Sequence, residues 1–338
     1  IRTAEATLSC KFDGEPLIVG TSGRYEFRNK GIDIFLDALK QLAETDALDR
    51  EVLVYITVPS ATTGPRKALQ AHLADENSPI DPKQNRFCTH YLEHPEWDQI
   101  LNSIAGSVLA NPSSKVKVVF VPTYLNGRDG IFDKSYYELL VGMDMTLFPS
   151  YYEPWGYTPL ESTAFSVPTL TTTLAGFGLW AGSQGEHEGV TLVARNDDNY
   201  AEAAREIAKA LLHFTKYTPQ EVEIARNAAA ELSRTALWSE LYAAYEKAYS
   251  EAIERSVTRT NRAVLNDGGG TTEQINFVRQ QLITEKPHWN RVMVEKVLPK
   301  RLHALEVLSH NLWWSWTSGA RDLFEYIDQK LWSECEKN

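Results

Sequence analysis

The stretch "LIVGTSG", residues 17–23, followed by "GIDIFLDALKQLAE", residues 31–44, decides the fold class. The first stretch is a short apolar run, which is typical of a strand buried on both faces. The second repeats apolar residues at three- and four-residue spacing and places Ile34, Phe35 and Leu39 on one helical face. A strand followed directly by an amphipathic helix is the unit from which parallel sheets are built.

The same alternation continues along the chain. Further strands are predicted at 51–60, 116–122, 144–150, 167–172 and 189–194, and further helices at 97–110, 135–143 and 159–165. A polar, proline-containing stretch at 61–86 interrupts the pattern. We therefore predict an α/β fold, a Rossmann-like parallel sheet with helices on both faces, over residues 1–195.

Residues beyond 195 are predicted to be helical. Apolar residues recur at helical spacing up to residue 255, so 196–255 is interpreted as the helical C-terminal part of the same domain. The segment 256–297 begins with polar sequence that contains three consecutive glycines, which is typical of a linker. In 298–338 leucines form a helical stripe before "NLWWSW", and we predict the start of a second helical module.

Composition limits the classes of partner. The chain has 338 residues, 43% of them hydrophobic, and a net charge of −11, which argues against nucleic acid or an anionic membrane as the main partner. No apolar run approaches the roughly 18 residues of a membrane span. Cys10, Cys88 and Cys335 lie far apart, which fits a reducing compartment, and we expect a cytoplasmic protein.

Two acids lie eight positions apart in "YYEPWGYTPLESTAF", residues 151–165. Glu153 follows a predicted strand, where parallel sheets bind their ligands, and we expect it to face a ligand. Glu161 has two interpretations. It is the last residue of Thr158-Pro159-Leu160-Glu161, a predicted capping box in which it only caps its own helix, or it lies at a helix start that binds a diphosphate or a sugar hydroxyl.

Two cations follow the first predicted strand, in "GTSGRYEFRNKG", residues 20–31. Arg24 and Lys30 stand before a helix start, at the same sheet edge as Glu153, a combination that suggests a diphosphate site. Taken alone, the pair could equally be solvated charges near a turn. Together with the acids it predicts a site for a nucleotide-sugar, which needs cations for its diphosphate and acids for its hydroxyls.

These stretches carry a resemblance to a known family. "GRYEFRNKG", "PSYYEPWGYTPLE" and "VPTLTTTLAGFG" resemble the C-terminal Rossmann half of eukaryotic-type glycogen synthases, retaining glucosyltransferases of the two-domain GT-B fold. The similarity runs over most of residues 16 to 250. Glu153 and Glu161 fit the Glu-x7-Glu element of that superfamily, which is a weak signal alone and a specific one together with the other stretches.

The resemblance implies roles for the charged residues. Arg24 and Lys30 would neutralise the donor's diphosphate as it leaves, with no metal and no cofactor required. Glu153 would contact the glucosyl ring near the reacting carbon, and Glu161 the ribose of the nucleotide.

Further residues belong to the implied donor site. Gly156, Tyr157 and Thr158 would present backbone and hydroxyl groups to the phosphates, and Trp155 is assigned to the same donor-binding set. Tyr136 matches the aromatic residue that stacks on the base, although packing inside its own helix explains it equally well. The glycines of "LAGFG", 174–178, match a loop of the family, but any turn from strand to helix could use them.

The implied reaction transfers glucose from a nucleoside diphosphate to the 4-hydroxyl of an α-1,4-glucan, with retention at the anomeric carbon. UDP-glucose is favoured over ADP-glucose as donor. Because the chain opens with Ile1 and has one Rossmann-like pattern, we expect a fragment that lacks the N-terminal Rossmann domain and is inactive in isolation. Residues 298–332 also resemble the beginning of bacterial and archaeal α-glucan phosphorylases, although an ordinary amphipathic helical hairpin would explain them too.

Three alternatives remain. A dehydrogenase is disfavoured because no Gly-x-Gly-x-x-Gly follows the first strand. Another retaining GT-B glycosyltransferase would keep the same site chemistry. A non-catalytic glucan-binding or scaffolding module would have no use for the diphosphate site that Arg24, Lys30 and Glu153 predict.

Overall fold

The structure is a computed structural model that describes residues 1–80 and 86–266, with side chains through residue 255. The chain divides into two units, Ile1–Leu237 and Trp238–Asn338. Within the described ranges, no helix has the length and the apolar content needed to cross a membrane.

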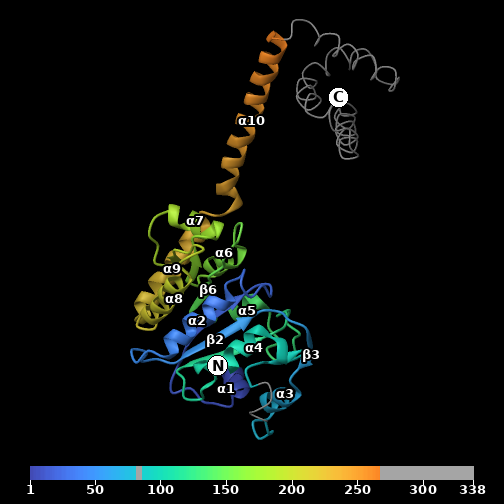
Figure 1. Ribbon diagram of the computed structural model, residues 1–338, viewed down its shortest axis with the longest axis vertical. Helices are drawn as coiled ribbons and strands as arrows, with labels where there is room; N and C mark the ends of the chain where they lie inside the picture. The colour runs from blue at the N-terminus through green and yellow to red at the C-terminus, as the bar shows by residue number, and fades with distance from the viewer. Residues whose placement is uncertain (81–85, 267–338) are drawn as a thin grey trace, which may run out of the picture. The chain divides into compact units, whose positions relative to one another are not determined.

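The first unit is built around a six-stranded sheet (Figure 1). Its strands are β1 (Leu17–Ser22), β2 (Val52–Thr57), β5 (Val116–Val121), β6 (Met145–Phe148), β7 (Thr169–Thr172) and β8 (Val190–Val193). They lie in the order β5-β2-β1-β6-β7-β8, and every neighbouring pair is parallel. All carboxyl ends therefore meet at one edge of the sheet, here called the carboxyl edge. The strand order reverses between β1 and β6, and such a switch point is where open parallel sheets bind ligands.

Helices cover both faces of this sheet. In the first unit they are α1 (Arg2–Leu8), α2 (Ile32–Ala43), α3 (Lys67–Ala74), α4 (Gln99–Ala105), α5 (Tyr136–Leu140), α6 (Tyr157–Ala164), α7 (Gly176–Ser183), α8 (Tyr200–Phe214) and α9 (Pro219–Arg234). Helices α2 and α8 pack on each other, as do α6 and α9. The predicted α/β class and the parallel sheet are confirmed.

Strand β2 shows how the two faces are separated. All six of its residues are buried, and successive side chains point to opposite faces. Val54 and Ile56 belong to the larger core, to which α2, α4 and α8 contribute, while Leu53 and Tyr55 belong to a second cluster with α1 and α5. A strand that is buried on both sides reads as an unbroken apolar run, as the sequence of β2 does.

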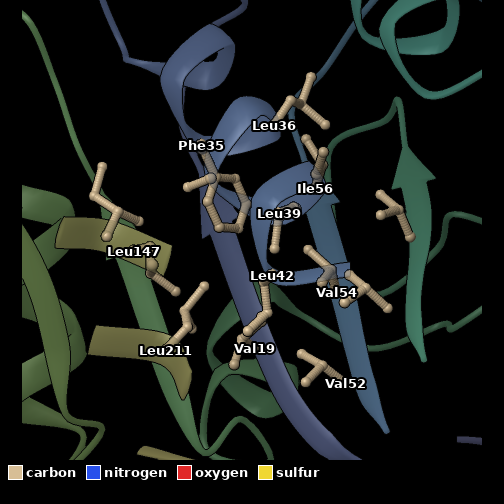
Figure 2. Close-up of a cluster of buried hydrophobic side chains, with 14 of the residues drawn as sticks. Val19, Phe35, Leu36, Leu39, Leu42, Val52, Val54, Ile56, Leu147 and Leu211 are labelled. Atoms are coloured by element: carbon tan, nitrogen blue, oxygen red, sulfur yellow. The ribbon is translucent and has the colours of Figure 1, made fainter. Parts of the chain in front are cut away.

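Helix α2 anchors the larger core. Figure 2 shows Phe35, Leu39 and Leu42 of this helix directed at Val19 of β1 and Val54 of β2. Each of the three side chains is at most 1% exposed. Full burial of such a side chain stabilises the fold by about 1.5–3 kcal/mol, and it fixes the segment between β1 and α2 from both ends.

The polar stretch at 61–86, for which the sequence predicts no element, contains short elements. Strand β3 (Thr62–Pro65) pairs antiparallel with β4 (His90–Leu92), and α3 lies between them. The pairing is irregular between Thr62 and Gly64. Glycine, proline and an irregular register remove the two-residue alternation by which a strand is recognised, which explains why the sequence pattern missed it.

The single helix predicted at 97–110 is wrong. The structure has two 3-10 turns, η1 (Pro95–Trp97) and η2 (Val108–Ala110), on either side of α4. Asp98 starts α4 by accepting a hydrogen bond from the Leu101 amide at 2.8 Å, and Gly106 ends it. The two cap residues divide a stretch whose apolar spacing suits one continuous helix.

The described part of the second unit is one helix, α10 (Trp238–Asn266). It continues through 256–266, where the sequence predicts the linker to begin, and the unit boundary lies after Leu237 rather than after 255. The reason is local, since no glycine or proline occurs between Trp238 and Asn266. The remaining linker and the predicted module at 298–338 lie outside the described residues.

Candidate donor-binding site at the carboxyl edge

Two segments meet at the carboxyl edge over the switch point, the one that follows β1 and the one that follows β6. The Tyr151 amide donates to the Asn29 carbonyl at 2.8 Å. Gly31 has a φ of 67°, and a Cβ placed on it would lie 1.9 Å from the Pro149 carbonyl oxygen. Only glycine fits there, because a side chain would collide with the neighbouring backbone.

Lys30 and Glu153 form an ion pair between these segments, with Lys30 Nζ donating to Glu153 Oε2. Their side chains are only 17% and 21% exposed. The predicted convergence of the cationic and acidic segments is thus observed for this pair. Since an ammonium group has three N–H donors, Lys30 can hold Glu153 and still donate to a second anion.

The backbone around Glu153 is also fixed. Its amide donates to the Leu174 carbonyl at 3.2 Å, and its carbonyl accepts from the Gly176 amide at 3.0 Å. Glu153 therefore forms a parallel bridge with Ala175, in the segment that follows β7. The acid is held between segments from three neighbouring strands, which limits how far its carboxylate can move.

Arg24 lies in the same segment as Lys30 and has a different environment. Its side chain is 77% exposed and pairs with Glu26 at 3.0 Å. The structure brings Lys30 to Glu153 and directs Arg24 toward Glu26. Arg24 is therefore an exposed cation at the edge of the site rather than part of the buried pair.

Helix α6 does not begin with the predicted capping box. Its N-cap is Gly156, at φ 109°, with no side-chain cap, so Tyr157 and Thr158 already occupy the first turn. The helix starts two residues upstream of Thr158, and its N-cap position has a left-handed backbone angle that glycine adopts without strain. Pro159 then takes the third position, where its missing N–H costs nothing. Glu161 is released from the capping role.

Glu161 instead accepts a hydrogen bond from the Tyr137 hydroxyl at 3.1 Å. The ring of Tyr137 stacks on Phe165 with centroids 5.0 Å apart and an interplanar angle of 10°. Both rings are exposed. Sequence reasoning missed Tyr137 and Phe165, although the adjacent tyrosines in "SYYELL" offered a signal for the first.

Tyr136 is held in a different way. Its hydroxyl shares a hydrogen bond of 2.8 Å with Ser22 at the end of β1, and its ring packs against the second apolar cluster. Burial raises the pKa of Tyr136 to about 12. The packing interpretation of this residue therefore has direct support, and its hydroxyl still lies at the carboxyl edge.

Trp155 is half-buried in an aromatic cluster. Its ring meets Phe177 at 6.1 Å and Trp180 at 5.8 Å, centroid to centroid. Gly176 and Gly178, interpreted from the sequence as loop residues, lie in the first turn of α7, where a Cβ on either would lie 2.2 Å from a backbone oxygen. Gly176 allows α7 to approach the loop that carries Trp155, and Gly178 allows it to approach the end of β7 at Thr172. The remaining predicted residue, Tyr157, is 69% exposed.

Sequence reasoning also missed Arg195, which lies just beyond β8. Its side chain is 6% exposed, donates to the Pro149 carbonyl and lies over the Tyr151 ring at 5.2 Å. Burial lowers the pKa of Arg195, and the charge of Asp33 partly offsets this effect. A charged residue directly after a strand of this sheet was the available signal. Arg195 supports the backbone from which the acidic loop departs.

The side chains gathered at this edge suit anions and hydroxyl groups better than a metal ion. Within the described ranges, no group of three histidine, cysteine, aspartate or glutamate side chains could hold a metal. A part-buried ammonium can bind a phosphate oxygen, and a carboxylate beside it can accept from sugar hydroxyls. The first-turn N–H groups of α6, next to Gly156, add a partial positive charge.

Comparison with known proteins identifies the family. A family model described as "Glycogen synthase" matches residues 72–303. The chain belongs to the glycogen synthase family. The match includes Glu153, Glu161 and the whole loop between them, while Arg24 and Lys30 lie upstream of it.

Curated relatives carry the same name. "Glycogen [starch] synthase" of Neurospora crassa is 28% identical over 305 residues, which covers 72% of this chain and 43% of that protein. The Caenorhabditis elegans protein is 28% identical over 292 residues (70% and 43%), and the human liver protein 27% over 327 residues (80% and 46%). The chain thus spans less than half the length of these relatives.

Two further matches carry no information about function. Residues 298–338 match a family described as "Protein of unknown function (DUF3417)". A solved glycosyltransferase of Rickettsia africae aligns over 66% of this chain and 44% of its own, with a TM-score of 0.38 and 15% identity. That structure is too distant to inform the site.

Proposed function

We propose that this chain is the donor-binding half of a glycogen synthase. The single observation that carries the proposal is the ion pair of Lys30 with Glu153 at the switch point of the sheet, in a member of this family. A cation and an acid at that edge are what a sugar linked to a diphosphate requires.

The proposed reaction moves a glucosyl group from a nucleoside diphosphate to the 4-hydroxyl of an α-1,4-glucan with retention. The bond from the anomeric carbon to the β-phosphate oxygen breaks, and the acceptor's 4-oxygen bonds to that carbon on the same face. The acceptor's proton goes to the departing phosphate oxygen. The diphosphate gains charge as it leaves, and cations already in place stabilise that charge without reorganisation.

Lys30 and Arg24 are the proposed phosphate ligands. Lys30 is held in place by Glu153, so it is preorganised, whereas Arg24 has to leave Glu26 and fold over the donor. In this proposal Glu153 accepts from hydroxyls of the glucosyl ring next to the reacting carbon. Its fixed backbone supports that role, because a positioned acceptor loses little conformational entropy on binding.

The nucleotide occupies the α6 side of the site in this proposal. Gly156, Tyr157 and Thr158 offer first-turn N–H and hydroxyl groups to the phosphates, and Glu161 holds the ribose. Glu161 now bonds to the Tyr137 hydroxyl, which a ribose hydroxyl would replace or join. Trp155 contributes by fixing the loop through its aromatic contacts.

The base is proposed to lie against the tyrosines of α5. Tyr136 remains the proposed stacking residue, and the exposed Tyr137 ring beside it, at 5.4 Å between centroids, widens the aromatic surface. The resemblance in "SYYEPWGYTP" supports UDP-glucose over ADP-glucose as the donor.

The context of the chain is also proposed. It is a cytoplasmic protein whose parent joins a glycogen synthase to an α-glucan phosphorylase module that begins near residue 298. The domain division at 195, with a linker before 298, belongs to this proposal.

The missing N-terminal Rossmann domain would supply most of the acceptor surface, so the 338-residue chain incubated with UDP-glucose and glycogen should release no UDP. Efficient elongation would contradict this.

Calorimetric titration of the 338-residue chain with UDP, ADP and NAD tests the proposal. We expect UDP to bind most tightly, and Lys30→Ala to weaken it at least about tenfold through loss of a charge-assisted hydrogen bond. The control is Lys209→Ala, which removes an exposed lysine that pairs with Glu206 on α8. Preference for NAD, or equal UDP affinity in the wild type and Lys30→Ala, would refute the proposed function.

A further inference from the structure

A hollow lies at the carboxyl edge, beside the proposed donor site. It is a cavity of about 350 Å³. The residues that shape it come from the segments after β1, β2 and β4: Tyr25, Phe27, Ser60, His94, Trp97 and Asp98. None of the proposed donor contacts lines it.

The strand order places the two sites side by side. The ion pair of Lys30 with Glu153, here called the donor pair, lies over β1 and β6. The cavity lies over β1 and β2, on the other side of β1. One chain segment serves both, with Phe27 in the cavity and Lys30 in the donor pair. Because three residues span at most about 11 Å, the two sites are within the reach of one oligosaccharide.

An aromatic platform forms one wall of the cavity. The rings of His94 and Trp97 stack with centroids 5.1 Å apart at 26°. Trp97 is nevertheless 74% exposed. His94 covers one face of the indole and leaves the other open. The open face of the indole is therefore available for contact with a ligand.

Polar groups stand around this platform. Asp98 is 8% exposed, and its carboxylate faces the Tyr25 hydroxyl, which accepts from the Ile100 amide at 3.2 Å. Ser60 and Gln99 add a hydroxyl and an amide to the lining. An apolar ring with hydroxyl, amide and carboxylate groups at its rim suits a ligand that has both apolar faces and hydroxyl edges.

The charge of the cavity selects among such ligands. None of the described residues that line it is lysine or arginine, whereas Asp98 is acidic and Glu96 lies 3.8 Å from His94. A phosphate or another anion would be repelled, and a neutral sugar would not. This is the reverse of the donor site, where Lys30 and Arg24 supply positive charge.

We propose that this cavity binds glucosyl units of the α-glucan acceptor, with the open face of Trp97 as the platform. The inference rests on the proposed function for the identity of the sugar. It assigns part of acceptor recognition to this half of the molecule, next to the reacting end of the donor.

Two ligands and three variants test the inference in the 338-residue chain. Binding of maltoheptaose, a linear α-1,4-glucan, is measured by calorimetry, with cellohexaose as the β-linked comparison and UDP as the donor-site probe. Trp97→Ala should weaken maltoheptaose about tenfold and leave UDP unchanged. His94→Ala, which removes a lining imidazole but keeps the open face of Trp97, should change maltoheptaose affinity about threefold or less. The matched control is Trp238→Ala, since Trp238 is 65% exposed and lies outside the cavity.

The outcomes separate this inference from the proposed function. The acceptor site is refuted if the wild type fails to bind maltoheptaose or binds cellohexaose with equal affinity. It is also refuted if Trp97→Ala binds maltoheptaose with full affinity. Both conclusions hold whether or not UDP binds. If UDP does not bind, the donor proposal fails, while maltoheptaose binding that depends on Trp97 would still support a glucan site. Retained circular dichroism and UDP affinity show that each variant is folded.

Discussion

The regions on the two sides of β1 at the carboxyl edge differ in charge and in exposure. On the β6 side, Lys30 and Glu153 form a part-buried ion pair backed by hydrogen-bonded backbone. On the β2 side, Trp97 and His94 stand exposed above an apolar cavity with an acidic rim. One segment of nine residues, from Gly23 to Gly31, contributes to both. In the two proposals, this single βα turn contributes to both the site for the donor's diphosphate and the site for the acceptor's sugar.

Gly31→Ala should break both regions at once and has the largest expected effect. The new Cβ would lie 1.9 Å from the Pro149 carbonyl oxygen, so β1, α2 and the acidic loop cannot keep their positions. We expect a loss of at least about 4 kcal/mol in the free energy of unfolding, measured with urea. Gly127→Ala is the control, because its φ is 84° but nothing lies within 4 Å, and it should lose only about 1 kcal/mol. Similar losses in both variants would contradict the account of Gly31.

Arg195→Met should disturb the charged region and spare the aromatic one. It leaves the Pro149 carbonyl without its buried donor and removes one of the two cations near Asp33, of which Arg28 remains. The expected loss is about 3 kcal/mol in urea unfolding. UDP affinity should fall while maltoheptaose affinity stays. The exposed Arg205 of α8 gives the matched control Arg205→Met, and an equally small effect in both variants would show that Arg195 does not support the loop.

Lys30→Ala is expected to weaken the binding of UDP about thirtyfold, equivalent to about 2 kcal/mol, and Arg24→Ala about tenfold.

Salt should separate the two regions without any mutation. Raising KCl from about 50 to about 300 mM should weaken UDP in the wild type and change maltoheptaose little, because only the first site relies on ionic attraction. Parallel salt dependence for the two ligands would remove the distinction between the regions.

Tyr25→Phe has the smallest expected effect, and it tests whether Tyr25 belongs to the cavity or to the donor site. It removes the hydroxyl that accepts from the Ile100 amide and faces Asp98, and both residues line the cavity. We expect a loss of about 1 kcal/mol in the free energy of unfolding and a modest drop in maltoheptaose affinity. UDP titration of the same variant should match the wild type, and a larger drop for UDP than for maltoheptaose would place Tyr25 with the donor site instead.

The parallel sheet was predictable because its signals are local. Strands β1 and β2 are continuous apolar runs, and α2 has a regular apolar face, so their patterns survive in the sequence. The β3–β4 pair was not predictable, since Gly64 and Pro65 interrupt its alternation. The division of 97–110 depends on the cap residues Asp98 and Gly106, which apolar spacing does not reveal.

The pairing of Lys30 with Glu153 in the candidate site was predictable, and the contacts of the other site residues were not. Residues that follow parallel strands meet at one edge, which is why Lys30 and Glu153 could be paired across 123 positions of sequence. Arg24 looks equivalent to Lys30 in sequence, but its contact with Glu26 in solvent depends on the course of the turn. The helix start at Gly156 and the contact of Glu161 with Tyr137 depend on backbone angles and on neighbouring elements that no local pattern contains.

A crystal structure of the 338-residue chain with UDP bound would show whether Lys30 and Glu153 lie at the donor's diphosphate. We expect a diphosphate oxygen within about 3.2 Å of Lys30 Nζ, with the Glu153 carboxylate beside the β-phosphate and Glu161 at the ribose. A diphosphate bound elsewhere, with the ion pair of Lys30 and Glu153 untouched, would contradict the account.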